Sequence, residues 1–218
     1  MKTQAEMMAY FASMPKKKRI NPYWAFDPEK KCIVTAEKPE KVLQIEKSVD
    51  LLKGVRQYFR NVFQSYKSEA QVLCVTEKDQ KKLTALGIPE LRCSDKEQWT
   101  LGGIRVHVMV LPQYNTAATS QIDEAFWQHM IIDNQIVPVA RIHSHHILEA
   151  YQSSTDYRTL NSNSLEIVMG RIEDSLLQAA FWLDQHGTNT KDVVMRMTEL
   201  EPNNFDIIQI PCGKPKMI

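Results

Sequence analysis

The sequence lacks any apolar run long enough to cross a membrane, and its first residues lack the hydrophobic block of a signal peptide. Charge is nearly balanced, with 27 Lys and Arg against 26 Asp and Glu, so nucleic acid and membrane surfaces are not expected partners. The four cysteines are scattered without a Cys-x-x-Cys pair, which predicts no structural zinc site and a reduced, cytoplasmic protein. A basic run at 15–19 resembles a nuclear-import signal, although short basic runs are usually just solvated.

Length and composition predict one main domain with an appended segment. The 218 residues are 43% apolar, which is enough for one substantial core. Residues 1–40 contain four prolines and are predicted to form an N-terminal extension, with 41–218 as the main domain. Tyr23, Trp24 and Phe26 indicate either that part of this extension is anchored on the core or that it offers an aromatic patch to a partner.

The most informative stretch of the chain carries two imidazoles, a hydroxyl and a carboxylate. It is His143-Ser144-His145, followed by Ser153 and Asp156. On a strand, alternate residues share a face, so the two histidines can converge on one ion while Ser144 points away with a structural role. With Asp156 as the third ligand, the set leaves the fourth position of zinc open, as in catalytic sites. The sequence therefore predicts one Zn²⁺ per chain.

This spacing, His-x-His-x7-Ser-x2-Asp, resembles the signature of the JAMM (MPN+) zinc metallopeptidases, which include deubiquitinating isopeptidases. Residues 150–156, Ala-Tyr-Gln-Ser-Ser-Thr-Asp, are similar to the same stretch in the ubiquitin-cleaving members. One departure is His146, where the family usually has proline. The resemblance implies an α/β fold of the MPN (JAB/cytidine-deaminase-like) type, a mixed curved sheet flanked by helices. It also implies hydrolysis of an amide bond in a protein or peptide, with the isopeptide bond to a ubiquitin-like protein as one candidate.

The flanking segments predict how the histidines are delivered. Residues 136–142 form a β-branched run that predicts a strand, and Pro138 indicates that this strand is at an edge or starts after the proline. Before it, Ser120 to Asp123 is a capping sequence for a predicted helix through about Ile132. Further strands are predicted at 165–169, at 176–183, which could equally be helical, and at 193–197. This alternation is typical of a sheet with helices packed on it.

A metal-activated water needs a base, and in the JAMM family this is a glutamate where a long helix gives way to the first central strand. Residues 42–66 carry apolar residues at three- and four-residue steps, which predicts such a helix. Glu69 then heads a short apolar run and is the predicted general base. Its alternative role is an exposed carboxylate at a helix end. Glu77 and Glu97 are weaker candidates for the base.

The separation between Glu69 and His143 is longer than the family usually shows. Residues 76–100 are rich in charge and contain Gly87 and Pro89, so they are predicted to be an insertion.

Ser153 is similar to the motif serine of the family, whose hydroxyl supports the developing oxyanion. One preorganised donor of this kind can be worth roughly 3 to 4 kcal/mol. The alternative role for a serine here is the N-cap of a following helix, for which Ser154 is the better candidate.

Two other classes of protein remain as alternatives. A catalytically silent MPN-type scaffold would bind partners in a larger assembly, but such relatives typically lack the metal residues that this chain retains. A metal-dependent phosphoesterase of the PHP kind also begins with His-x-His but needs several further histidines. Only His186 follows His146, and only His107 and His129 lie upstream. The sequence therefore favours a zinc peptidase or isopeptidase.

Overall fold

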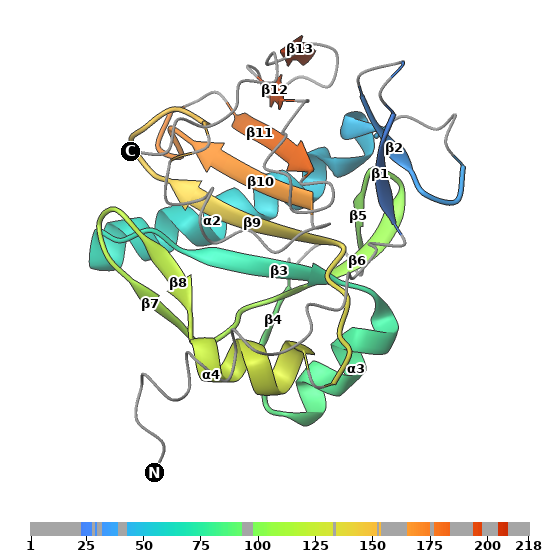
Figure 1. The fold of residues 1–218 in the computed structure, drawn as a ribbon. Coiled ribbons are helices and arrows are strands. Elements are labelled where there is room, and N and C mark those ends of the chain that lie inside the picture. Colours follow the sequence, from blue (N-terminus) through green and yellow to red (C-terminus); the bar gives the residue numbers. More distant parts are fainter. Residues whose placement is uncertain are drawn as a thin grey trace, which may run out of the picture.

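The fold is a mixed α/β arrangement in which one long helix lies across a twisted sheet (Figure 1). The computed structural model describes residues 23–27, 29, 32–38, 43–92, 98–132, 134–151, 153, 165–174, 177–183, 194–197 and 205–208. The helices in these ranges are η1 (Ile45–Ser48, a 3₁₀ turn), α2 (Val49–Tyr66), α3 (Glu77–Ala85), α4 (Glu124–Phe126) and η2 (Trp127–Ile132, a π-helix). The strands are β1 (Trp24–Asp27), β2 (Cys32–Thr35), β3 (Gln71–Val75), β4 (Glu90–Leu91), β5 (Trp99–Leu101), β6 (Ile104–Met109), β7 (Gln113–Asn115), β8 (Ser120–Ile122), β9 (Ala140–His145), β10 (Leu165–Gly170), β11 (Gln178–Leu183), β12 (Val194–Met197) and β13 (Phe205–Ile208).

Strands β3 and β9 form the centre of the main sheet, whose order is β11-β10-β9-β3-β6-β4 with β5 also paired to β6. The sheet is mixed because β9 runs parallel to β10 and antiparallel to β3. Strand β9 begins at Ala140, so the predicted strand starts only after Pro138, as one of the two interpretations of that proline required. Strand β10 confirms the predicted strand at 165–169, and β11 shows that 176–183 contains a strand rather than a helix.

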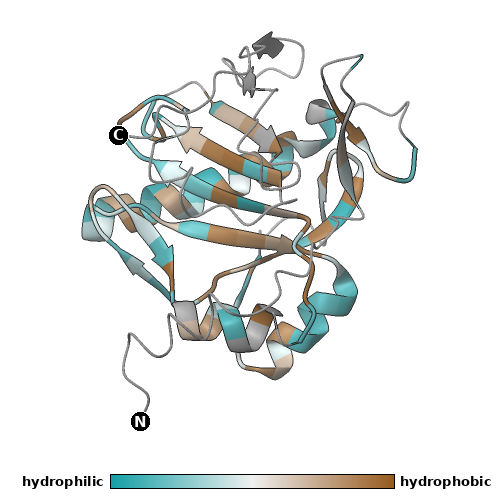
Figure 2. Cartoon of the chain, in the orientation of Figure 1, coloured by the Kyte–Doolittle hydropathy of each residue, from teal (hydrophilic) through white to brown (hydrophobic). Residues whose placement is uncertain are grey.

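Helix α2 covers one face of this sheet because its apolar stripe matches the side chains that point to that face. Val55 and Phe59 are fully buried in a cluster that includes Val72 of β3 and Ile142 of β9. Figure 2 shows hydrophobic residues along the central strands that the helix crosses. The predicted helix at 42–66 is confirmed from Ile45 onward, beginning as the 3₁₀ turn and ending at residue 66.

The opposite face of β3 and β6 packs on α3 and on the α4–η2 segment. Leu73 and Met109 form a second cluster with Leu83 of α3 and Ile131 of η2. Within the segment 76–100, α3 therefore contributes to the core and β4 and β5 both pair with β6. That this segment is an insertion relative to the JAMM family stays a prediction.

The hairpin β1–β2 packs on the core that lies under α2. Trp24 is buried, and its indole N–H donates to the carbonyl of Val139, just before β9, at 2.8 Å. Ile33 of β2 is fully buried in the same cluster. These contacts fit the anchored alternative for this part of the N-terminal segment. The basic run at 15–19 lies outside the described residues, among which no helix has the length and apolar character needed to span a bilayer.

The predicted helix through about Ile132 is confirmed as α4 and η2, but within the predicted capping sequence at 120–123 only Asp123 caps it. Ser120 belongs to β8, which pairs with β7 in a hairpin, and its hydroxyl donates to the side-chain oxygens of Gln113 and Asn115. The helix begins after Asp123, whose carboxylate accepts the N–H of Phe126 at 2.7 Å. Of the four residues 120–123, the first three thus form a strand, and only Asp123 caps the helix.

A partly buried charge pair ties β4 to β6. Glu90 accepts a hydrogen bond from His107 Nδ1 at 2.7 Å and one from Arg92 at 3.2 Å. Burial raises the pKa of Glu90, but these hydrogen bonds and positive charges outweigh it, and the net pKa lies below the ordinary carboxyl value.

The Glu90 pair makes the stability of the fold depend on pH. A carboxyl group with a lowered pKa stabilises the folded state above its ordinary pKa, and this contribution is lost as pH falls through the lowered value. We expect Glu90→Gln to lower the free energy of unfolding by about 1 kcal/mol at neutral pH. The difference from wild type should shrink towards zero in acid, as measured by urea denaturation at several pH values. An equal difference at all pH values would contradict this assignment.

Candidate metal centre

The two histidines of the signature lie at the C-terminal end of β9, on the sheet face opposite α2. His143 and His145 are 7% and 4% exposed, and their ring centroids are 5.2 Å apart. Alternation along the strand places both side chains on the same face, as predicted. The end of β9, the start of β3 and the tip of the β7–β8 hairpin lie on one side of the molecule (Figure 1).

Glu69 lies two residues before β3, the strand that pairs with the histidine-bearing β9. The antiparallel register pairs Gln71 with His143, and the N–H of Ser144 donates to the carbonyl of Ala70 at 3.0 Å. Two further residues along the same register place Glu69 opposite His145. Opposed residues on antiparallel strands project to the same face with Cβ atoms roughly 4.5 to 5.5 Å apart. Glu69 is 5% exposed, so it is not the exposed helix-end carboxylate that was its alternative role.

Ser144 fastens the two strands together between the histidines. Its side chain is buried, and its hydroxyl oxygen accepts the N–H of Ala70 at 3.1 Å. This agrees with the structural role predicted for Ser144. The contact joins the residue between the histidines to the residue after Glu69.

Both ring nitrogens of His146 form hydrogen bonds with backbone groups of the protein. Its Nε2–H donates to the carbonyl of Ala117 at the tip of the β7–β8 hairpin, and its Nδ1 accepts the N–H of Ile147 at 3.0 Å. The ring also stacks on Phe63 of α2, with 4.6 Å between centroids. His146 therefore connects α2, the β7–β8 hairpin and the end of β9.

The chain after His146 folds back over the end of β10. The N–H of Arg171 donates to the carbonyl of Leu148 at 2.7 Å, and Ala150 is buried against β10 and β11. Gly170 lies directly beneath, where a Cβ atom would come within 2.1 Å of the backbone nitrogen of Ala150. The returning segment then brings the Tyr151 ring edge-on to His145, with 4.9 Å between centroids. The loop that leads to Ser153 thus passes beside the histidines.

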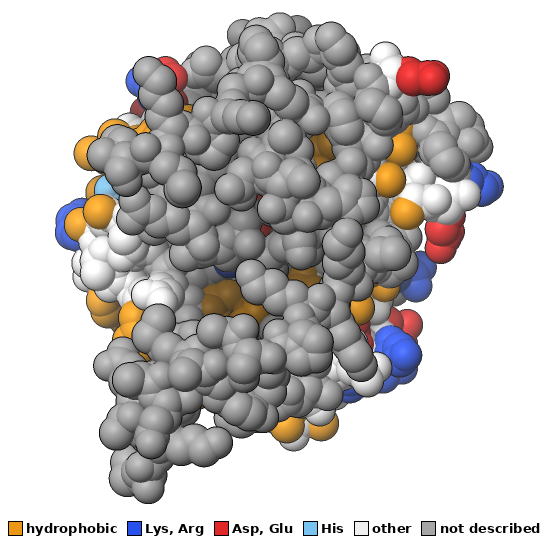
Figure 3. Space-filling view, viewed as in Figure 1, with side chains coloured by type: hydrophobic (Ala, Val, Ile, Leu, Met, Phe, Trp, Pro, Cys, Tyr) orange, Lys and Arg blue, Asp and Glu red, His pale blue; other side chains and the backbone are white. Residues whose placement is uncertain are grey.

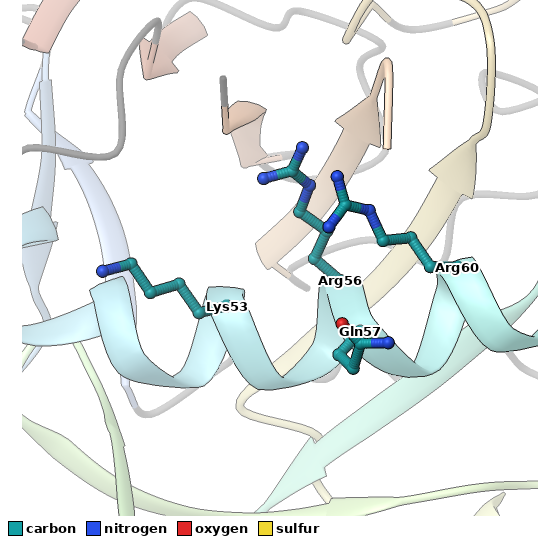
Figure 4. A pocket seen from close by; sticks show the side chains of 4 residues that line it. All are labelled: Lys53, Arg56, Gln57 and Arg60. Carbon is teal, nitrogen blue, oxygen red and sulfur yellow. The ribbon is translucent and has the colours of Figure 1, made fainter. Parts of the chain in front are cut away.

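Two arginines of α2 hold the turn that receives this loop. Arg56 and Arg60 extend from one side of the helix (Figure 4) and donate to backbone carbonyls of Ile172 and Asp174. They line a hollow of about 240 Å³ together with Lys53 and Gln57. Burial and the neighbouring Arg60 lower the pKa of Arg56, and the nearby carboxylates Asp174 and Glu173 oppose this shift.

The same turn is bonded on its other side to the loop after the histidines. The N–H of Ile172 donates to the carbonyl of His146 at 2.7 Å. Arg56 is therefore linked to the backbone of His146 by two hydrogen bonds that both involve Ile172. Helix α2 thus contacts the chain around His146 through the turn at Ile172 as well as through the Phe63 stack.

The remaining two predicted site residues are placed less completely. Ser153 is half-buried, and Asp156 lies outside the described residues, as do Glu97 and Ser154. Among the described residues, no group of three side chains of the kinds that bind metals comes together. Asp156 follows Tyr151 by five residues, and five extended residues span at most roughly 17 Å.

The buried polar surface around the histidines extends along β9. Arg141, two residues before His143 and on the same face, forms an ion pair with Glu166 of β10 at 2.8 Å. Glu166 is 3% exposed and lies opposite Arg141 in the register. Because the two charges neutralise each other, this pair maintains a polar face without adding net charge near the imidazoles.

Glu77, a weaker candidate for the general base, lies at the wrong end of β3. It heads α3 after the strand, is largely exposed, and forms an ion pair with Lys81 at 2.8 Å. Seven residues lie between it and Glu69, and the five that form β3 alone span roughly 17 Å.

Comparison with known proteins leaves the family open, because no family model and no curated protein matches this chain.

Sequence reasoning missed three residues that shape the site. Gly170 and Gln113 were not singled out, and His146 was noted only as a departure from the family pattern. A glycine at the end of an otherwise bulky strand is itself a sign of close backbone approach, so Gly170 could have been found. The sequence contains no comparable signal for Gln113, whose bonds to Gln71 join residues 42 apart in the chain.

Proposed function

We propose that this chain is a zinc-dependent peptidase or isopeptidase of the JAMM (MPN+) type, built on an MPN fold. The observation that carries the proposal is the placement of buried Glu69 opposite His145, with His143 beside it on the same sheet face. The order of elements supports the fold: a long helix, a strand preceded by the glutamate, and a strand carrying the histidines that pairs in parallel with the strand after it.

The side chains at this site suit zinc. Imidazole nitrogen is a preferred zinc ligand, and a third ligand from a carboxylate completes a common catalytic set. His143, His145 and Asp156 would hold the ion. When bound, zinc supplies the Lewis acidity that makes water a nucleophile at neutral pH.

The other residues divide the proton transfer and the charge stabilisation between them. Glu69 takes the proton from the attacking water and returns it to the leaving amine, because a carboxylate that does not bind the metal can act as a base. The hydroxyl of Ser153 donates a hydrogen bond to the oxyanion that forms at the attacked carbonyl. Ser144 and the backbone of Ala70 keep the two strands in register.

The proposed substrate is an amide bond in a protein or peptide, with the isopeptide bond to a ubiquitin-like protein as the specific candidate. Large apolar side chains are exposed in the loop after the histidines, namely Ile147, Leu148 and Tyr151. Hydrophobic side chains are visible at the margin of the molecule on this side (Figure 3). An exposed apolar strip beside a polar site suits a polypeptide better than a small polar ester.

The two alternative functions have weaker support. In a phosphoesterase of the PHP kind, further histidines would join the first pair. His107 instead bonds Glu90 and pairs with Val75, at the end of β3 away from His143. The silent scaffold is opposed by the retention of every signature residue and by the buried position of Glu69.

Zinc content tests the proposal directly. We expect elemental analysis of the dialysed protein to find about one zinc per chain, and Asp156→Ala to lose it. Ser154→Ala is the matched control, because it lies two residues from Asp156 in the sequence and removes no proposed ligand, and it should keep the metal. Absence of zinc from wild type even after reconstitution would contradict the peptidase and favour the scaffold.

A further inference from the structure

One edge of β3 is incomplete at the residues that lead from Glu69 into the strand. Of the β3 residues, only Leu73, Cys74 and Val75 pair with β6 along this edge, and β9 pairs with the other edge. Because backbone groups alternate along a strand, the N–H groups of Glu69 and Gln71 and the carbonyl of Gln71 point to the side that β6 leaves open. Buried backbone groups of this kind require other partners.

The side chain of Gln113 takes the place of the missing strand. Its amide oxygen accepts the N–H of Gln71 at 2.8 Å, and its amide nitrogen donates to the carbonyl of Gln71 at 2.9 Å. A primary amide has the same donor and acceptor as a peptide group, so one side chain reproduces both hydrogen bonds of a strand neighbour. Ser120 and Leu111 hold this amide in orientation, through a hydroxyl donor at 3.0 Å and a carbonyl acceptor at 3.0 Å.

Other residues of the β7–β8 hairpin form hydrogen bonds with residues next to β3 and β9. The carbonyl of Thr116 accepts the N–H of Glu69 at 2.8 Å, and the carbonyl of Ala117 accepts the Nε2–H of His146. The side-chain amide of Gln71 also donates to the carbonyl of Ser120 at 2.8 Å. The hairpin therefore contacts the backbone of Glu69 on β3 and the residue that follows His145 on β9.

We infer that Gln113 is a positioning residue that sets the place of Glu69 relative to the histidines, with the β7–β8 hairpin as the frame that carries it. This inference rests on the proposed function of Glu69. The hydrogen bonds of the Gln113 side chain run to Gln71, Leu111 and Ser120, so its loss should displace the proposed base more than the proposed metal ligands. A shift of about 1 Å in a catalytic group can reduce the rate on the order of 100-fold.

Gln113→Glu tests the inference because it keeps the shape of the side chain and removes its donor. The carboxylate would then face the carbonyls of Gln71 and Leu111, which repel it. We expect kcat to fall by roughly 10- to 100-fold with KM within about twofold of wild type, and zinc content to stay at the wild-type value. Gln121→Glu is the matched control, since it makes the same chemical change at an exposed position of the same hairpin.

Hydrogen exchange supplies a readout that does not depend on activity. In Gln113→Glu, the amides of Glu69 and Gln71 should exchange at least about tenfold faster, while those of β10 remain as in wild type. Ser120→Ala is a milder second variant, which removes only one bond to the Gln113 amide, and it should show the same changes to a smaller degree. Unchanged exchange in both variants, or a kcat equal to that of Gln121→Glu, would overturn the inference.

The two proposals fail in different ways. If wild type binds no zinc and hydrolyses no amide, the proposed function fails whatever the exchange results show. If wild type is active and Gln113→Glu loses zinc and activity in proportion, Gln113 maintains the whole fold and does not position Glu69.

Discussion

Glu69→Gln should remove hydrolysis while leaving zinc bound. Glutamine has nearly the same shape as glutamate and can still occupy the space opposite His145, but it cannot take a proton from water. Loss of a general base usually reduces kcat by about 10²- to 10⁴-fold. We expect zinc content equal to that of wild type and a kcat lower by this factor, measured on a fluorogenic isopeptide or peptide substrate.

Glu77→Gln is the matched control for this substitution. Glu77 is also a carboxylate at an end of β3, but it is exposed and bonded to Lys81 at the end away from the histidines. Exposed ion pairs contribute little to stability, so this variant should have the stability and kcat of wild type. Full activity in Glu69→Gln would remove Glu69 from the mechanism, and loss of activity in Glu77→Gln would point to the other end of the strand.

Gly170→Ala should disturb the segment 147–151, which follows the histidines, more than an alanine at any other described glycine would. The new Cβ would approach the nitrogen of Ala150 to 2.1 Å, the carbonyl carbon of Glu149 to 2.3 Å and the oxygen of Leu148 to 2.6 Å. All three are backbone atoms, so the loop must move as a unit. Overpacking of this kind costs about 1 to 3 kcal/mol. We also expect zinc affinity to fall roughly 10- to 100-fold, since the displaced loop leads to the proposed ligand Asp156.

Denaturation of the metal-free protein and competition with a chelator measure these two effects separately. Gly87→Ala is the control, because Gly87 has a positive φ of 78° but open space around its missing Cβ. It should lose about 1 kcal/mol of stability from backbone strain and keep its zinc affinity. A Gly170→Ala protein with wild-type stability and zinc affinity would show that the loop is not fixed against β10.

The parts of the fold that were predictable were those with strong local patterns. The apolar stripe of α2 and the short run after Glu69 each continued without a competing signal, and both elements formed where expected. The polar cluster at Ser120 was ambiguous, because the same residue types cap helices and close hairpins. Pairing between β7 and β8 decided the outcome there, and tertiary contacts of this kind leave no trace in local periodicity.

The candidate site divides in the same way. His143 and His145 are two residues apart, so alternation along one strand was enough to predict that they share a face. The position of Glu69 depended on resemblance, because the bond that brings its neighbour Ala70 to Ser144 joins residues 74 apart in the chain. Gln113 could not be predicted, since a side chain that replaces a strand has no sequence pattern of its own.

The long separation between β3 and β9 also bears on how the protein matures. Contacts between distant parts of a chain form late, because the intervening loop must first be closed. The two histidines and Asp156 belong to one short stretch of sequence. The proposed base, Glu69, is brought close to the histidines only when β3 pairs with β9. On the proposed function, a partly folded chain would therefore bind zinc before it could hydrolyse a substrate. A zinc assay would not distinguish such chains from folded ones, whereas a turnover assay would.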